Sequence, residues 1–198
     1  QCLVAPNTNP FNSRALSELT MPTALLANRT LPNRIEFDYD GMLLGSVQRL
    51  KEQGCRSIGM INCAPENHYD SLYRVFEMIV HREELATRNE WIRRSSSDVG
   101  DLGYFGYQEF RKLWSLPEKP DGLIVWSDDV AQGVILAILE NGIRVPAQLH
   151  CVFHRNAGVP LLCPLPVTWA ISDENDAALG LIRVLEDQFE GKKIAPIL

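Results

Sequence analysis

The stretch from Asp121 to Phe153, DGLIVWSDDVAQGVILAILENGIRVPAQLHCVF, constrains the fold of this 198-residue chain more than any other. Its run Leu123-Ile124-Val125 is short, unbroken and rich in β-branched residues, as expected for a parallel strand that is covered on both faces. The sequence therefore predicts a βαβ unit, with a buried strand at residues 122–126, a helix that opens at Ser127 or Asp128, a stop at Asn141-Gly142 and a second strand after Val145-Pro146.

The helix of this unit has clear start and stop signals. Ser127 and Asp128 are both good N-cap residues, and Asp129 in the first turn suits the positive end of the helix dipole. Gly142 supplies the left-handed residue that closes a helix, and a proline follows it. The helix is expected to be mostly buried because its apolar residues recur at helical spacing: Val130, Val134 and Ile138, with Ala131, Ile135 and Leu139 beside them.

The same alternation continues along the rest of the chain. Short strands are expected at residues 2–5, 24–27, 35–37, 57–61, 91–92 and 167–171, and polar loops at residues 6–12, 62–68 and 95–101. Helices are expected at residues 42–53, 69–85, 104–114 and 173–190, with a helix-like piece at 15–19. Their inward-facing residues are predicted to be Leu43, Val47 and Leu50; Leu72, Phe76 and Ile79; Phe110, Leu113 and Trp114; and Ala177, Leu181, Leu185 and Phe189. This order predicts an α/β fold with parallel sheets.

Composition limits the function. With 45% hydrophobic residues, the chain can form one large domain or two small lobes. Its net charge of -6 argues against binding of nucleic acid by this chain alone. No apolar run approaches the length of a membrane span. The five cysteines are scattered and form no C-x-x-C pair, which disfavours a disulfide framework or a zinc site and favours a reducing, cytoplasmic location.

We find no pattern that indicates catalysis. The chain has no G-x-S-x-G elbow, no H-E-x-x-H motif and no cysteine with an activating partner nearby in sequence. Its four histidines lack metal-ligand spacing, and the glycines at 100, 103 and 106 lack the strand and the Gly-Lys-Ser/Thr ending of a phosphate loop. We expect no enzyme activity, no cofactor and no metal.

Three segments carry a resemblance to a known family. DYDGMLLGSVQRLKEQGCRSIGMI (38–61) is similar to a segment that runs from an Asp-Asn pair through a helix to H-L-x-x-x-G-H-R-x-I-A. SDDVAQGVILAILENGIRVPAQLHCV (127–152) resembles N-D-x-x-A-x-G-x-x-x-A-x-x-x-x-G-x-x-V-P-x-D-x-x-V, and residues 167–191 resemble a crossover strand and final helix. The family that these segments resemble is the lactose-repressor/galactose-repressor family of transcription regulators, in its effector-binding region.

This resemblance implies the two-lobed periplasmic-binding-protein type I fold. Residues 1–36 and 172–198 would then form part of the proximal lobe, and residues 37–171 the distal, effector-binding lobe. The family's helix-turn-helix, hinge helix and first proximal strands have no counterpart, and Gln1-Cys2-Leu3 begins in mid-strand without an initiator methionine. We therefore expect a fragment, from which those parts were either removed or not retained.

Departures from the family bear on the ligand. Leu72 stands where the family usually has an effector-binding arginine, and Ser127 stands for the asparagine before the cleft aspartate, which is kept as Asp128. The family's G-F-D-D becomes Phe153-His154-Arg155-Asn156. With one basic group lost and one acidic group replaced by a basic one, a plain hexose does not transfer from the best-known members.

Ligand-binding candidates follow from the ends of the strands, where ligands bind in parallel sheets. Asp128 either binds ligand hydroxyls or only caps its helix. Arg155 either meets a carboxylate or phosphate of an effector, pairs with Asp128 across an empty cleft, or faces water. Asn156 and His154 either contact the ligand or satisfy loop backbone.

Four further candidates have equally plain structural alternatives. Trp126 stacks on a sugar ring or fills the space between lobes, with Tyr104 and Phe105 as weaker aromatic candidates. Leu72 is core or an apolar ligand contact. Glu66 and His68 line the cleft or belong to a solvated loop.

We therefore expect an allosteric sensor: the core of a cytoplasmic, homodimeric transcription regulator that binds a small, carbohydrate-like effector and reaches DNA only through an absent N-terminal helix-turn-helix domain. The alternative is an exported periplasmic-type sugar-binding protein that serves a transporter. An enzyme on an α/β fold is a third hypothesis, which the absence of nucleophile and metal motifs disfavours.

Overall fold

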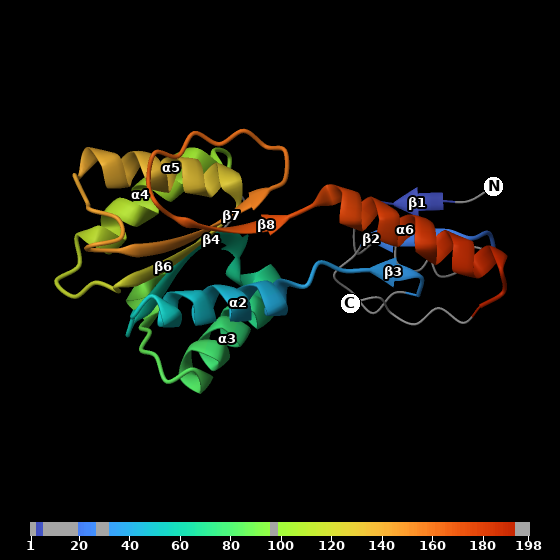
Figure 1. Ribbon diagram of the computed structural model, residues 1–198, viewed down its shortest axis with the longest axis horizontal. Coiled ribbons are helices and arrows are strands. Elements are labelled where there is room, and N and C mark those ends of the chain that lie inside the picture. The colour runs from blue at the N-terminus through green and yellow to red at the C-terminus, as the bar shows by residue number, and fades with distance from the viewer. Residues whose placement is uncertain (1–2, 6–19, 27–31, 96–98, 193–198) are drawn as a thin grey trace. The chain divides into compact units, whose positions relative to one another are not determined.

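Five parallel strands in the order β5-β4-β6-β7-β8 form the larger of two sheets in the computed structural model, which describes residues 3–5, 20–26, 32–95 and 99–192 (Figure 1). The strands are β4 (Ile58–Pro65), β5 (Ile92–Ser95), β6 (Gly122–Trp126), β7 (His150–Asn156) and β8 (Thr168–Ser172). Every pairing between them is parallel, so the predicted α/β class with parallel sheets is confirmed.

Helices cover both faces of this sheet. Figure 1 shows α4 (Leu102–Trp114) and α5 (Asp128–Glu140) on one face, and α2 (Tyr39–Glu52) and α3 (Glu66–Arg82) on the other. Two apolar clusters result: one packs around Phe110, Val134 and Phe153, and the other around Leu43, Phe76 and Met60. Burying the centre of the sheet between two helical layers explains why the central strand β6 is a continuous apolar run.

The βαβ unit forms as predicted. β6 is buried apart from its last residue, and the Ser127 side chain caps α5 by accepting from the Val130 amide. Val130, Val134 and Ile138 are fully buried, whereas Leu139, expected beside them, is 47% exposed. Gly142 has a φ of 61°, the left-handed conformation expected after the helix end.

The smaller sheet contains β1 (Leu3–Ala5), β2 (Thr23–Leu26) and β3 (Arg34–Ile35), all parallel. α6 (Glu174–Phe189) packs Leu181 and Val184 against Ala24 and Ile35. The prediction that Phe189 faces inward is wrong, because it is 65% exposed. The last turn presents Gln188 to the sheet instead, and its amide bonds to both the N–H and the C=O of Thr23, at 3.1 and 2.7 Å.

The chain divides into two units, residues 1–38 with 173–198, and residues 39–172. The predicted loop at 6–12 and the helix-like piece at 15–19 lie outside the described residues. Trp91, expected in a strand, ends a 3-10 turn (Asn89–Trp91) just before β5.

One predicted loop is wrong. Residues 62–68 were expected to be loop, but β4 continues to Pro65 and α3 begins at Glu66. Glu66 and His68 therefore belong to the first turn of a helix. Polar residues suit that turn as well as they suit a loop, because its backbone N–H groups have no partner within the helix.

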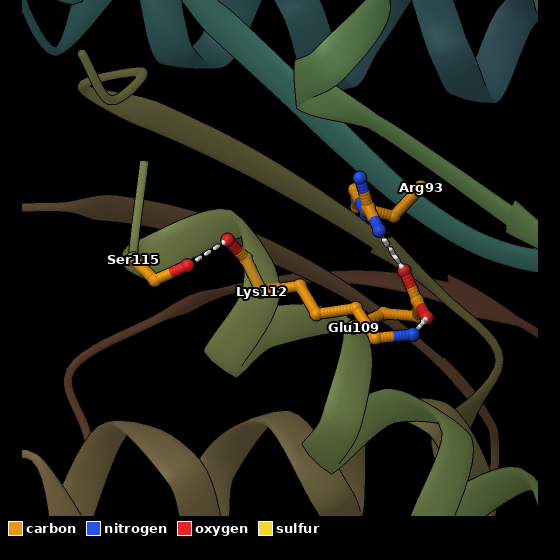
Figure 2. Close-up of polar contacts among 4 residues, drawn as sticks. All are labelled: Arg93, Glu109, Lys112 and Ser115. Atoms are coloured by element: carbon orange, nitrogen blue, oxygen red, sulfur yellow. Dashed lines mark hydrogen bonds and ion pairs between the residues drawn. The ribbon is translucent and has the colours of Figure 1, made fainter. Parts of the chain in front are cut away.

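A buried carboxylate ties α4 to the edge strand β5. Glu109 is 8% exposed and accepts from Arg93 Nη2 at 2.6 Å and from Lys112 Nζ at 2.6 Å, while Ser115 Oγ donates to the Lys112 carbonyl (Figure 2). Two cationic partners compensate the cost of burying the acid.

Glycines allow α4 and α5 to approach backbone to backbone. A Cβ on Gly133 of α5 would lie 1.8 Å from the carbonyl oxygen of Gly103, and one on Gly106 of α4 would lie 2.2 Å from that of Val130. Neither contact can be relieved by moving a side chain, since the obstructing atoms belong to the backbone. Any larger residue must push the two helices apart.

We predict that Gly133→Ala destabilises the protein by about 1–3 kcal/mol or more, the cost of overpacking a close contact. Gly45→Ala is the matched control, because Gly45 lies in α2 with nothing within 4 Å of its Cβ position. That change should be neutral or stabilising by up to about 1 kcal/mol. Urea unfolding of both variants measures the difference, and equal stability would contradict the glycine contact.

Candidate functional site

The carboxyl ends of the five parallel strands lie at one edge of the larger sheet, which we call the carboxyl edge. β6 ends at Trp126, β7 at Asn156 and β8 at Ser172. In open parallel sheets ligands bind beyond these ends. The candidate residues predicted from β6 and β7 therefore lie where this type of sheet binds ligands.

Ser127 makes the turn from β6 into α5. Its φ of 73° is unusual for a residue with a side chain, and its hydroxyl accepts from the Val130 amide at 3.4 Å. The alternative that Asp128 merely caps the helix is wrong, because Asp128 is the first helical residue and Ser127 holds the cap position. The carboxylate of Asp128 is thus left for other partners.

Asp128 uses this carboxylate to hold the end of the neighbouring strand. Its Oδ2 accepts from the backbone N–H of Asn156 at 3.3 Å and from Asn156 Nδ2 at 3.1 Å, while Oδ1 accepts from the Asp129 amide at 3.2 Å. Asp128 is only 8% exposed, so these donors offset the cost of burying its charge. The predicted candidates Asp128 and Asn156 therefore act as a pair.

Arg155 contacts Trp169 and does not pair with Asp128, the partner considered in the sequence analysis. Its guanidinium carbon lies 4.9 Å from the centre of the Trp169 ring, whereas the Asp128 carboxylate is hydrogen-bonded to Asn156. Its Nε is buried and has no hydrogen-bond partner among the described residues. The interpretation that Arg155 pairs with Asp128 is wrong, because the acid is occupied by Asn156 and the arginine stacks on an aromatic face.

Aromatic rings gather at the end of β6. The rings of Trp126 and His154 are stacked, with centroids 5.1 Å apart and planes within 2° of each other, and Tyr39 lies against Trp126 at 5.5 Å. Trp126 is half-buried rather than enclosed. An apolar, flat surface is thus held beside the Asp128–Asn156 pair.

His154 is buried with one nitrogen unpaired. It is 8% exposed, and its Nε2 is 2.9 Å from Ser172 Oγ, while Nδ1 is buried without a hydrogen-bond partner in the described part of the chain. Burial lowers the pKa of the imidazole below its usual 6.5, and the nearby Asp128 carboxylate opposes this only in part. His154 is therefore a neutral hydrogen-bonding group at neutral pH.

The other candidates lie apart from this cluster or are only partly described. Leu72 is half-buried and packs against the core with Phe76 and Ile79, as its core interpretation predicts. Glu66 and His68 lie in the first turn of α3. Tyr104 is 64% exposed, and Phe105 packs against the apolar cluster under α4 and α5.

Sequence reasoning missed two residues of the carboxyl edge. Ser172 binds His154, and the available signal was its position at the end of the strand beside β7. Asn62 is buried, at 3% exposure, near the end of β4, and its carbonyl accepts from the hydroxyl of Tyr73 at 3.3 Å. The available signal was an asparagine directly after the apolar run at residues 58–61.

The carboxyl edge offers hydrogen bonding and stacking. Among the described residues, no group of three or more His, Cys, Asp and Glu side chains is arranged to hold a metal ion. Cys63, near the end of β4, has a pKa raised by burial, so it is a poor nucleophile. The described cysteines at positions 55, 63, 151 and 163 are free.

No helix in the described ranges is both long and apolar enough to cross a membrane.

A parallel sheet covered on both faces, with hydrogen-bonding residues at its carboxyl edge, defines the chain as an α/β protein of a ligand-binding type. The chain belongs to the family of periplasmic binding protein-like domains, which matches residues 47–197. This match and the similarity to curated repressors and solved LacI-family structures confirm the resemblance to the effector-binding region of lactose-repressor/galactose-repressor regulators.

The curated relatives are transcription regulators rather than enzymes. The chain is 23% identical over 192 residues to the transcriptional repressor CytR of Escherichia coli strain K12, covering 93% of this chain and 54% of that protein. It is 27% identical over 165 residues to the transcriptional repressor PurR of Actinobacillus pleuropneumoniae, covering 83% and 46%. The chain thus spans about half the length of the curated relatives it matches.

Solved structures agree on the fold. A regulatory protein of the LacI family from Chloroflexus aggregans superposes with a TM-score of 0.80 at 17% identity, covering 98% of this chain and 70% of that one. A LacI family regulator from Lactobacillus casei with bound glucose gives a TM-score of 0.75 at 18% identity, covering 98% and 73%.

We predict that acid destabilises the protein partly through His154. Because burial lowers its pKa in the folded state, the unfolded state binds the proton more readily, and stability is lost as the pH falls below about 6.5. His154→Phe keeps a ring against Trp126 but cannot titrate. Urea unfolding at about pH 7.5 and about pH 5.5 should show a smaller loss in the variant than in the parent chain. An equal loss in both would show that His154 is not the responsible group.

Proposed function

We propose that this chain is the effector-sensing part of a transcription regulator and that it binds a small molecule at the carboxyl edge. The observation that carries the proposal is the unpaired, buried Nδ1 of His154 beside the Asp128–Asn156 pair. An unpaired buried nitrogen costs about 1–3 kcal/mol, and a ligand that supplies its partner recovers that cost.

The chemistry of the edge favours a carbohydrate-like effector. Trp126 offers an aromatic surface, His154 and Asn156 offer hydrogen bonds, and Arg155 offers a positive charge with no ion pair among the described residues. Sugars bind through this combination of stacking and hydroxyl recognition. The glucose-bound Lactobacillus casei regulator supports the same class, while the departures at Leu72 and Arg155 favour a derivative over a plain hexose.

In the proposed mechanism residues 37–171 form the distal lobe, and residues 1–36 and 172–198 form part of the proximal lobe. An effector bound to the carboxyl edge favours one arrangement of the lobes, with a coupling of typically about 1–3 kcal/mol to an attached DNA-binding domain. An effector that bound both arrangements equally would regulate nothing. The repressor relatives favour this cytoplasmic sensor over an exported sugar-binding protein.

A homodimer is the proposed working form. Large apolar side chains are exposed on α5 and on the segment that follows β7: Leu136, Leu139, Val159 and Leu162, the last at 91%. A contiguous apolar patch on a protein surface often marks a site of association.

We predict that Asp128→Ala and Arg155→Ala each weaken effector binding at least tenfold, which is about 1.4 kcal/mol. Asp128→Ala releases Asn156, and Arg155→Ala removes the positive charge at the end of β7. The effector is first found by a thermal-shift screen of sugars, sugar acids and nucleobases, and the affinities are then measured by calorimetry. Asp129→Ala and Arg49→Ala are matched controls, since both residues are exposed, and should bind normally. Unchanged affinity in both test variants would remove these residues from the site.

For assembly, we predict that light scattering gives twice the 22.3 kDa mass of one chain. Leu162→Asp should lower the mass to that of a monomer, because a carboxylate would be buried at the interface. Met78→Asp, on the exposed face of α3, should leave the dimer intact. A monomer mass for the parent chain at high concentration would count against the dimer.

A further inference from the structure

Arg155 brings a positive charge to the carboxyl edge that forms no ion pair with a described residue. It is the last residue but one of β7 and pairs in register with Ile171 of β8, which is 53% exposed. The Nε of its guanidinium is buried, so a ligand does not reach that atom. The residue is half-buried, and its terminal nitrogens Nη1 and Nη2 are neither buried nor hydrogen-bonded to a described residue. These two nitrogens are the atoms that a ligand can contact.

The guanidinium of Arg155 rests on an aromatic support. Its carbon lies 4.9 Å from the centre of the Trp169 ring, and Trp169 makes an edge contact with Phe153, with 6.1 Å between the ring centres. Phe153 is fully buried in the core under α4 and α5. Because the ring beneath the guanidinium is fixed, Arg155 has little side-chain freedom left to lose when it binds a planar anion through two parallel N–H groups.

Other basic residues do not compete with Arg155 for an anion at this edge. No Lys or Arg occurs in the eight residues that follow each strand of the larger sheet: 66–73, 96–103, 127–134, 157–164 and 173–180. Arg93 and Arg94, in β5, have partners of their own, since Arg93 pairs with Glu109 and Arg94 lies over the Tyr73 ring. Among the described basic residues at these strand ends, Arg155 is therefore the one left for an anion.

The same five segments limit the charge of that anion. They contain nine acidic residues, among them Asp128, which is buried and hydrogen-bonded to Asn156. One guanidinium balances one negative charge, and a second negative charge on the ligand would face these acids without a cation of its own. A carboxylate, with a single charge, fits this balance better than a phosphate group, which carries about −1.5 to −2 at neutral pH.

We propose that the effector is a sugar acid, whose carboxylate accepts from Nη1 and Nη2 of Arg155 and whose hydroxyl groups bind beside Asn156. This proposal rests on the function proposed above and names the charge of the ligand at that same site. The two oxygens of a carboxylate match the two parallel N–H groups of a guanidinium. A neutral hexose leaves the charge of Arg155 unpaired and gains no ionic contact.

Sugars that differ only at C6 test the proposal: D-glucuronate against D-glucose, and D-galacturonate against D-galactose. Each is titrated by calorimetry into the full 198-residue chain at about pH 7, where the acids are ionised. We expect an acid to bind at least tenfold more tightly than its parent hexose, a difference of about 1.4 kcal/mol. The 6-phosphates of the two hexoses should bind more weakly than the acids, because they carry about two negative charges.

Three variants connect this preference to the guanidinium. Arg155→Gln removes the charge and should abolish the preference for the acid, while hexose affinity changes less than about threefold. Arg155→Lys keeps the charge but loses the planar fork, so it should retain part of the preference. Arg49→Gln is the matched control, because it removes the same charge from an exposed position on α2 and should leave the preference intact.

Binding is located through the ring that supports Arg155. In ¹H–¹⁵N spectra of the parent chain, the indole N–H signal of Trp169 should shift on addition of the acid. Its assignment comes from the signal that disappears in Trp169→Phe. Spectra of the other variants without sugar verify that they are folded.

Three results would overturn the proposal. The first is a hexose or a hexose phosphate that binds as tightly as the matching acid, which removes the preference for a carboxylate but leaves the proposed carbohydrate site standing. The second is a preference that survives in Arg155→Gln, which places the carboxylate elsewhere. The third is the absence of binding by every compound of the set, which overturns the carbohydrate class of the proposed function as well.

Discussion

The hydrogen bonds between Asn156 and the Asp128 carboxylate are the contact on which the carboxyl edge depends. They join the start of α5 to the end of β7, two elements separated by 28 residues in sequence. The contact requires the turn at Ser127, whose positive φ and capping hydroxyl leave Asp128 free of the cap position. Because Ser127 holds the cap position, Asp128 Oδ2 is available to bond Asn156 in addition to the pairing of β7 with β8. The acid at this edge is therefore a structural group that holds Asn156, and under the proposed function it acts on a ligand through Asn156.

Most of the fold could be predicted because local sequence determines it. β6 needs only an unbroken apolar run, and α5 needs only a cap, an apolar stripe and a closing glycine. The prediction was wrong where the same residues suit two structures. Glu66 and His68 are as acceptable in a first helical turn as in a loop. Phe189 has the spacing of an inward-facing residue, but Gln188 faces the sheet because it makes two hydrogen bonds to Thr23. The spacing of apolar residues does not predict those hydrogen bonds.

The position of the candidate site could be predicted from the sequence, but the contacts between its side chains could not. Strand alternation puts successive β7 residues on opposite faces of the sheet. Arg155 accordingly lies with Trp169, and His154 with Trp126. Which partner each face meets depends on Trp169 of β8 and on Trp126 of β6, and the spacing of residues within β7 does not encode either contact. The unpaired nitrogens of His154 and Arg155 could not be foreseen for the same reason, since being unpaired is a property of the assembled surroundings.

His154 also connects the carboxyl edge to the point where the chain leaves the larger unit. Its Nε2 is hydrogen-bonded to Ser172 Oγ, and the amide of Ala157 donates to the Ser172 carbonyl at 2.7 Å. Ser172 directly precedes Asp173, which caps α6 and begins the second segment of the smaller unit. Under the proposed function, a ligand that engages His154 Nδ1 acts on the same ring that holds Ser172. The differential contact that allostery requires is then a change in how firmly this one junction residue is held.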